Sequence, residues 1–333
     1  MNRSRSTRSR LLAGLAALSV GALALAGCAS DAAPESTGEG DASSTDGGTW
    51  PRTFENADGT TTEIPEQPQN IVSTSVSVSG TLLAIDAPLV ASGTDAAGDF
   101  FAQWADVAEE QGVENLWSAG EVDIEAAYAY DADLIVVAAT GADSVADQVA
   151  ELQQIAPTIV VDYGAQTWQD LAVELGEATG LEEQAQASID EFDAYVEDAA
   201  SSITVPEGQA NIVSYNGPSE GNPIGRAEGP HGQLLAQLGF EIEEPNPDWH
   251  TQPQEREDFV FASYENLTEL TADTTFILSQ DDEGAKAFVE DPTLANLPSV
   301  QDGQVYGLGL NSFRIDKYSA TEIVDSVVNH FGN

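Results

Sequence analysis

The chain has 333 residues with 57 acidic and only ten basic side chains, which gives a formal net charge of −47. So few cations cannot neutralise phosphates along a groove, which excludes nucleic acid as a partner. Cys28 is the only cysteine, which excludes a disulfide within the chain. The length is sufficient for two domains of ordinary size.

Residues 1–27 have the layout of an export signal. Four arginines precede an apolar run from Leu11 to Leu25, and "LAGC" follows at Leu25–Cys28. The run is shorter than the roughly 20 residues that span a bilayer stably, so the pattern predicts a signal peptide. "LAGC" resembles the lipobox of bacterial lipoproteins, which implies that Cys28 is lipidated and anchors the chain to the outer face of the cell membrane. A free thiol is the alternative.

Residues 28–49 are small, polar and acidic, without apolar periodicity. A segment of this composition cannot bury enough surface to fold. We expect a flexible acidic tether between the anchor and the rest of the chain.

Residues 50–180 alternate strand and helix patterns. The apolar runs "DLIVVAA" (133–139) and "TIVVDY" (158–163) predict strands buried in a parallel sheet. A third strand is predicted over 70–77, and "TWQDLAVELGEATG" predicts a helix that Gly180 ends. This part of the chain is therefore expected to form an N-terminal α/β lobe.

The stretch 181–203 predicts one long helix, because its apolar residues fall on a single stripe. Strand and helix patterns then resume over 204–333, ending in a helix after residue 318. The fold class expected is α/β, with two Rossmann-like lobes bridged by a single long helix.

Basic residues are scarce after Cys28, and five of the six lie beyond residue 225. Arg226 and Arg256 occupy polar loops, and Arg314 and Lys317 lead into the last helix. Loops beyond the carboxyl ends of strands hold ligands in open α/β sheets, so these four cations predict a site for a multiply charged anion. The alternative is that each cation pairs with a surface carboxylate, an interaction worth ~0–1 kcal/mol.

Aromatic residues in both predicted lobes are candidates for the lining of the site. Phe101 and Trp104 in "GDFFAQW" could line the N-terminal side, and Trp249 could line the side that carries Arg256. Packing in the core or on a lobe surface is the alternative for each ring.

Catalytic motifs are missing from the sequence: there is no Gly-x-Ser-x-Gly elbow, phosphate-binding loop or His-Glu-x-x-His pair. The three histidines, His231, His250 and His330, do not have the spacing of a metal cluster. We therefore expect no enzyme activity, no cofactor and no metal bound directly by the protein. A cell-surface enzyme of the α/β type, or an adhesive surface protein, remains an alternative.

A weak internal repeat places Glu125 eight residues before Asp133, and Glu265 eight residues before Asp273. Each aspartate introduces a predicted strand. The repeat suggests that each lobe presents a helix-start glutamate at an equivalent position. Stabilisation of the helix start by its dipole would also explain a glutamate there.

Several segments resemble the ferric-enterobactin binding proteins, which are solute-binding lipoproteins of ABC importers in the siderophore and cobalamin class. They include "IVSTSVSVSGTLLAIDAPLVASG", "LQQIAPTIVVDY" and "NLPSVQDGQVYGLGLNSFRIDKYSA", and the resemblance runs from about Arg52 to the C-terminus. It implies the class III periplasmic-binding-protein fold, with a ligand held between the lobes. Arg256 and Arg314 match basic residues of that family, whereas Arg226 lies beside an aromatic position.

The resemblance implies capture of a ferric siderophore, most simply a catecholate, and delivery to a dimeric ABC permease with its ATPase. Glu125 and Glu265 would dock onto that permease, and the protein would act as a monomer. Lys317 would assist the arginines, and Trp249 would stack on the ligand. The N-terminal loop "DAAGDFFAQW" lacks the arginine that the family supplies there, so ferric hydroxamate, haem or cobalamin are alternative cargoes. A surface siderophore esterase is the alternative from a different class.

Overall fold

The computed structural model describes residues 49–218, 221–253 and 256–333. The predicted signal peptide, the lipidation site Cys28 and nearly all of the predicted tether lie outside the described residues. Among the described residues, no helix has both the length and the apolar character needed to cross a bilayer.

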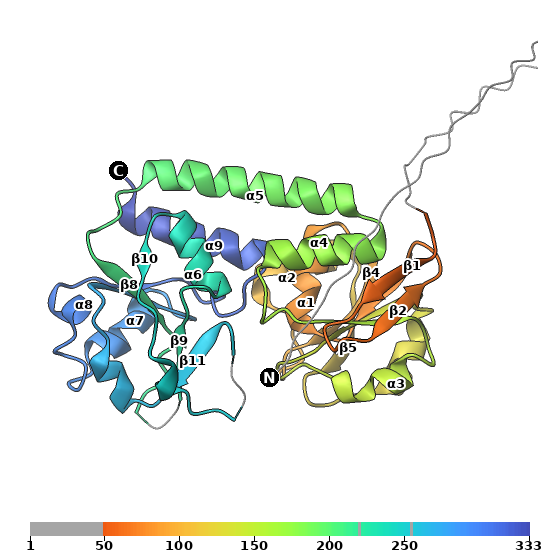
Figure 1. The fold of residues 1–333 in the computed structure, drawn as a ribbon, viewed down its shortest axis with the longest axis horizontal. Coiled ribbons are helices and arrows are strands. Elements are labelled where there is room, and N and C mark those ends of the chain that lie inside the picture. The colour runs from red at the N-terminus through yellow and green to blue at the C-terminus, as the bar shows by residue number, and fades with distance from the viewer. Residues whose placement is uncertain (1–48, 219–220, 254–255) are drawn as a thin grey trace, which may run out of the picture. The chain divides into compact units, whose positions relative to one another are not determined.

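The N-terminal lobe is built on a five-stranded parallel sheet in the order β5-β4-β3-β6-β7. Figure 1 shows this lobe on the right, in orange to yellow-green. Strands β6 and β7 are buried along their whole length and almost entirely apolar, as in sheets covered on both faces. An antiparallel hairpin, β1 (Arg52–Glu55) and β2 (Thr61–Ile64), precedes the sheet. The strands are β3 (Ile71–Ser73), β4 (Leu89–Thr94), β5 (Glu114–Ser118), β6 (Leu134–Ala138) and β7 (Thr158–Val161). The helices are α1 (Val76–Ala84), α2 (Ala102–Gln111), η1 (Ile124–Tyr130), η2 (Ala146–Gln148), α3 (Val149–Leu152) and α4 (Trp168–Thr179).

The C-terminal lobe has a mixed sheet in the order β11-β9-β8-β12-β13, with β10 also paired to β8. Strands β8, β12, β13 and β10 run parallel, whereas β9 and β11 form an antiparallel edge. The strands are β8 (Gln209–Val213), β9 (Asn222–Gly225), β10 (Glu241–Ile242), β11 (Phe259–Ala262), β12 (Thr274–Ile277) and β13 (Val305–Gly307). The helices are α6 (Pro230–Gln237), η3 (Pro247–Trp249), η4 (Glu265–Glu269), α7 (Asp282–Val289), α8 (Pro298–Gln301) and α9 (Lys317–Phe331).

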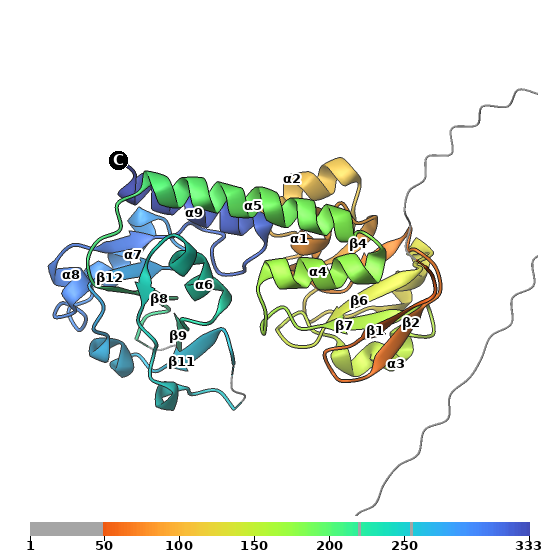
Figure 2. The ribbon, with the colours of Figure 1, turned by 45° about the horizontal axis from the view of Figure 1, so that its top comes forward.

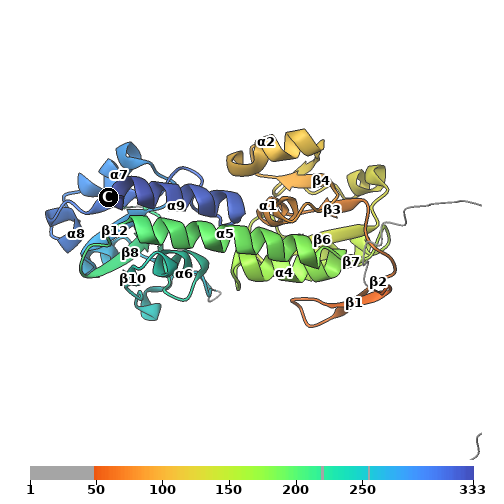
Figure 3. The same ribbon diagram turned by 90° about the horizontal axis from the view of Figure 1, so that it is seen from above.

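A single helix, α5 (Glu182–Ser202), connects the lobes and lies along both of them (Figures 2 and 3). It begins with two glutamates, which suit the positive end of the helix dipole. Its apolar stripe packs on α4 of the first lobe and on α6 and α9 of the second. The Tyr195 hydroxyl donates a hydrogen bond to Asp325 of α9 over 2.6 Å. The predicted architecture of two α/β lobes bridged by one long helix is confirmed.

The start of α9 returns from the C-terminal lobe to contact α1 and α2 of the N-terminal lobe. Asp316 caps α9 by accepting hydrogen bonds from the backbone N–H groups of Tyr318 and Ser319. Its second carboxylate oxygen accepts from Gln103 of α2 over 3.1 Å. Gly80 permits this approach, because a Cβ at that position would lie 2.6 Å from the Asp316 oxygen. The buried carboxylate thus fixes one lobe against the other beside the predicted site.

Candidate functional site

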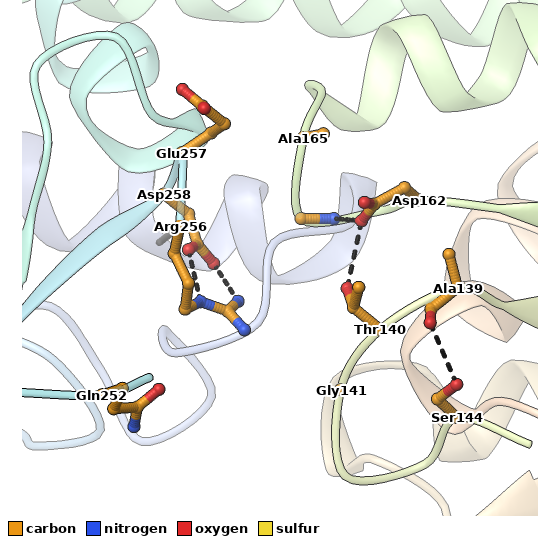
Figure 4. Close-up of a pocket in the computed structure, with 11 residues that line it drawn as sticks. Ala139, Thr140, Gly141, Ser144, Asp162, Ala165, Gln252, Arg256, Glu257 and Asp258 are labelled. Carbon is orange, nitrogen blue, oxygen red and sulfur yellow. Dashed lines mark hydrogen bonds and ion pairs between the residues drawn. The ribbon is translucent and has the colours of Figure 1, made fainter. Parts of the chain in front are cut away.

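Loops of the two lobes enclose three pockets. In the N-terminal lobe these loops follow β4, β6 and β7, whereas in the C-terminal lobe they precede β11 and follow β13. The first has a volume of about 340 Å³ and lies between the loops 139–144 and 162–165 of one lobe and residues 252 and 256–258 of the other (Figure 4). A second cavity, of about 480 Å³, lies between the loop 95–103 and the segment 310–314. The third pocket is small, and Tyr163, Phe313 and Arg314 are among the residues that line it. Phe313 and Arg314 also line the second cavity. This is the cleft position at which open α/β sheets bind ligands.

Arg256 directs its guanidinium toward the loops of the N-terminal lobe (Figure 4). A Cβ on Gly164 would lie 3.5 Å from its Nη2 atom. Its Nε and Nη2 atoms form a bidentate pair with the Asp258 carboxylate at 2.7 and 2.6 Å. This hydrogen-bonded pair raises the pKa of Arg256 above its ordinary value. Asp258 therefore orients the cation but also offsets its charge.

Arg314 lies over two aromatic rings, with its guanidinium carbon 4.7 Å from the centroid of Phe313 and 5.7 Å from that of Tyr163. Phe313 precedes it in the chain, whereas Tyr163 belongs to the opposite lobe. No carboxylate of the described residues forms an ion pair with Arg314 within 4.0 Å. Its charge is thus available in the cleft and is flanked by π faces.

Tyr163 is held in place by a buried carboxylate. Its hydroxyl donates to Asp143 over 3.3 Å, and burial raises the pKa of Tyr163. Asp143 also accepts from the Ser75 hydroxyl at 2.6 Å and from the Ser77 backbone N–H at 3.0 Å. The ring that faces Arg314 is therefore fixed to the junction between β3 and α1.

His231 supports the segment that carries Arg314. Burial lowers the pKa of His231 to about 4, so the imidazole is neutral near pH 7. Its Nε2 lies 2.8 Å from the Ser312 carbonyl oxygen and must carry the proton in order to donate to it. The Ser312 hydroxyl in turn accepts from the Ser279 N–H. These contacts fix the chain two residues before Arg314.

Of the four predicted cations, only Arg256 and Arg314 line the three pockets of the cleft, Arg256 the first and Arg314 the other two. Arg226 pairs with Glu244 at 3.0 Å and donates from Nη1 to the Arg256 carbonyl, so it supports the loop without lining the three pockets. Lys317 pairs with Glu191 of α5 at 2.6 Å. It lines a separate groove between α1, α5 and α9. The predicted convergence of four cations is wrong, because neighbouring carboxylates hold these two elsewhere.

The predicted aromatic residues also separate. Phe101 lines the second cavity. Trp104 is completely buried beneath Phe100, with ring centroids 5.1 Å apart, so its ring cannot face a ligand. Trp249 packs against the hydrophobic core of its own lobe instead of lining the three pockets. The prediction for Trp104 is wrong, because the start of α2 turns this side chain inward.

The cleft contains residues that the sequence reasoning did not select: Tyr163, Asp143, Asp258, Thr140, Asp162 and Phe313. Asp162 and Tyr163 directly follow β7 and Thr140 follows β6. The rule that ligands bind beyond the carboxyl ends of parallel strands could have identified these three. In contrast, the sequence carries no signal that Asp143 is buried against Ser75.

Glu125 and Glu265 occupy equivalent local structures. Glu125 lies in the first turn of η1, and Glu265 begins η4. Both are exposed, and each precedes a strand of its lobe. The repeat in the sequence therefore corresponds to a repeat in local structure.

Histidine, cysteine and carboxylate side chains do not assemble into a metal centre: in the part of the chain that the structure describes, no three of them come together suitably. The fold and the cleft define a two-lobe solute-binding protein of the class III type, in which one rigid helix bridges the lobes.

The chain belongs to the periplasmic binding protein family, whose model matches residues 71–310. It is 37% identical over 286 residues to the ferric enterobactin-binding periplasmic protein FepB of Escherichia coli O6:H1 (strain CFT073), covering 83% of this chain and 89% of FepB. It is 26% identical over 239 residues to the probable siderophore-binding lipoprotein YfiY of Bacillus subtilis (strain 168), covering 71% of each. The crystal structure of holo-ViuP is similar with a TM-score of 0.85 and 51% identity, covering 86% of this chain and 97% of that chain.

Proposed function

We propose that the protein captures a ferric siderophore, a catecholate of the enterobactin type, outside the cytoplasmic membrane and delivers it to an ABC permease for iron uptake. The names of FepB and YfiY support a ferric siderophore as the cargo. Iron would enter the cleft inside the siderophore as cargo, without a ligand from the protein.

The observation that carries this proposal is the position of Arg314 between Tyr163 and Phe313. A ferric tris-catecholate is a trianion with flat aromatic faces, and both properties match a cation between π surfaces. At an effective dielectric near 20, one contact between unit charges at ~4 Å is worth about 4 kcal/mol before desolvation. Because Asp258 offsets Arg256, Arg314 supplies most of this attraction.

Fluorescence quenching titrations with a ferric tris-catecholate, a ferric hydroxamate, haem and cobalamin test the cargo. Binding should quench the emission of the chain's five tryptophans. We expect saturable quenching by the ferric tris-catecholate at the lowest concentration. Saturation by one of the other three cargoes without any response to the first would reject the catecholate.

The protein acts as a receptor and not as an enzyme in this proposal. The cleft side chains are arginines, aromatic rings and hydrogen-bonded carboxylates, and the relatives are named as binding proteins. Incubation of the protein with a ferric triester siderophore, followed by chromatography, should return the ligand intact. Steady release of hydrolysis products would favour the esterase alternative.

Anchoring and docking complete the proposal. Lipidation of Cys28 would hold a monomer at the extracytoplasmic face of the membrane, and Cys28→Ala should release the protein into the medium. Glu125 and Glu265 would each dock onto one subunit of a permease dimer, because both are exposed at the starts of equivalent helices.

A further inference from the structure

We propose that the second cavity of the cleft is a preformed subsite for an aromatic arm of the ligand. We name it the aryl subsite and define it by Phe100, Phe101, Gln103, Leu310, Phe313 and Arg314. The inference rests on the proposed function, because it assigns part of the same ligand to a specific cavity. It goes beyond the attraction between charges, because it identifies the part of the siderophore that this cavity would recognise.

The walls of the aryl subsite are rigid aromatic rings from both lobes. On one side, Phe100 and Phe101 pack on the buried Trp104 with centroids 5.1 and 6.3 Å apart. On the other, Phe313 stacks on Phe259 with centroids 5.4 Å apart and planes inclined by 6°. Rings that are already held by the core lose little freedom on binding, so the subsite suits a flat partner.

Leu310 leaves apolar surface uncovered at the rim. Its side chain is 68% exposed, the highest exposure of any large hydrophobic side chain in the described residues. A single exposed leucine is ordinary on a protein surface. At the rim of an aromatic cavity, however, an apolar ligand that covers it would gain the hydrophobic term.

The charged residues that line the aryl subsite differ in their partners. Arg314 has no carboxylate partner in the described residues. Asp95 and Asp99 also line the cavity, and the Asp95 carboxylate accepts hydrogen bonds from the N–H groups of Ala97 and Asp99. An anionic oxygen should therefore be directed toward Arg314, and the uncharged edge of the ring toward Phe101. A hydroxyaryl group has this polarity, whereas an aliphatic hydroxamate arm offers no ring.

Hydrogen bonds within the protein tie the two walls together. Gln103, which lines the subsite, donates to Asp316, and the Asp316 backbone N–H donates to the Ser319 hydroxyl. That hydroxyl donates to the carbonyl oxygen of Arg314 over 2.6 Å. The loop of one lobe and the cation of the other are thus held at a fixed separation.

Three substitutions test the aryl subsite by titration with a ferric tris-catecholate. Phe101→Leu keeps apolar bulk but removes the ring, and it should weaken binding about three- to tenfold, because an aromatic pair contributes beyond the burial of apolar area. Phe101→Tyr keeps the ring and should stay within about twofold of the wild type. Leu310→Ser should weaken binding about threefold or more. Val289→Ser, on the exposed face of α7, is the matched control and should have no effect.

Equal affinities for Phe101→Leu, Phe101→Tyr and the wild type would overturn the inference, as would equal losses in both Phe101 variants. If these results accompany tight binding by the wild type, only the aryl subsite is rejected and the proposed function stands. If the wild type itself does not bind the ferric tris-catecholate, the proposed function fails first. Leu310 is exposed, so Leu310→Ser remains informative even if a Phe101 variant unfolds.

Discussion

Arg314 and Tyr163 belong to different lobes, yet the guanidinium carbon of one lies 5.7 Å from the ring centroid of the other. The contact crosses the cleft at the boundary between the small pocket and the aryl subsite. A cation held in this way, without a carboxylate partner among the described residues, has most of its charge available to a ligand.

The first prediction is that Arg314→Met weakens binding of a ferric tris-catecholate about ten- to a hundredfold, because it removes the available charge but retains an apolar side chain of similar length. The measurement is a titration at fixed ionic strength. Arg52→Met is the control, because Arg52 pairs with Glu182 near the start of α5. Equal affinities in both variants would contradict the role of Arg314.

The second prediction concerns Asp258, which offsets the charge of Arg256. Asp258→Asn should strengthen binding of the trianion severalfold at low ionic strength, because it removes a negative charge from the pocket wall. The same change should lower the free energy of unfolding by about 1–3 kcal/mol, because a largely buried ionic hydrogen bond is lost. Ligand titration and urea unfolding measure the two effects.

The control for this substitution is Asp302→Asn, which removes an exposed charge elsewhere in the same lobe. It should change neither the stability nor the affinity appreciably. A weaker affinity in Asp258→Asn would mean that orienting Arg256 matters more than the charge that Asp258 adds.

The sequence predicted the framework of the fold because its signals are local. The apolar runs at 133–139 and 158–163 became β6 and β7, and Gly180 ends α4 with a φ of +73°. The antiparallel edge was missed. Strand β9 contains Pro223 and Gly225, residues typical of a loop, and it forms only because β8 and β11 pair with it.

The site was harder to predict, because a scarce cation is visible in the sequence but its partner is not. Among 57 acidic residues, the choice of Glu191 for Lys317 and Glu244 for Arg226 depends on which helices and loops pack together. Arg256 pairs with a carboxylate only two residues away, and that contact could have been anticipated. Arg314 escapes such pairing because aromatic rings surround it.

The third prediction is that Lys317→Met leaves the affinity for the ferric siderophore within about twofold of the wild type. Lys317 lies in the groove beside α5, where it pairs with Glu191, and an exposed pair of this kind is worth ~0–1 kcal/mol. The same titration series measures it. A loss comparable to that of Arg314→Met would show that Lys317 does reach the ligand.

The fourth prediction concerns the two exposed glutamates at the starts of η1 and η4. Glu125→Lys and Glu265→Lys should each reduce the stimulation of the permease's ATPase in proteoliposomes at least fivefold, and together they should abolish it, because like charges would meet across the interface. Siderophore affinity should be unchanged. Glu207→Lys, at another exposed position, is the control. Normal stimulation by the double variant would exclude docking through these residues.

The fifth prediction follows from Asp316, whose side chain is buried at the contact between the lobes. Burial raises its pKa to about 6 from an ordinary value of 3.8. Between these two values the folded protein holds a proton that the unfolded chain has released. The stabilisation from this proton is therefore complete below about pH 4 and is lost as the pH rises through about 6.

Asp316→Asn removes this titration and keeps a side chain that caps helices about as well. The unfolding free energy of the variant, relative to the wild type, should therefore rise by up to about 3 kcal/mol between pH 4 and pH 7. Urea unfolding at intervals of half a pH unit measures the difference. Asp281→Asn replaces the exposed N-cap of α7 and should show no comparable rise. If the difference in unfolding free energy between Asp316→Asn and the wild type stays constant across this range, the Asp316 carboxylate is already ionised at pH 4 in the folded protein.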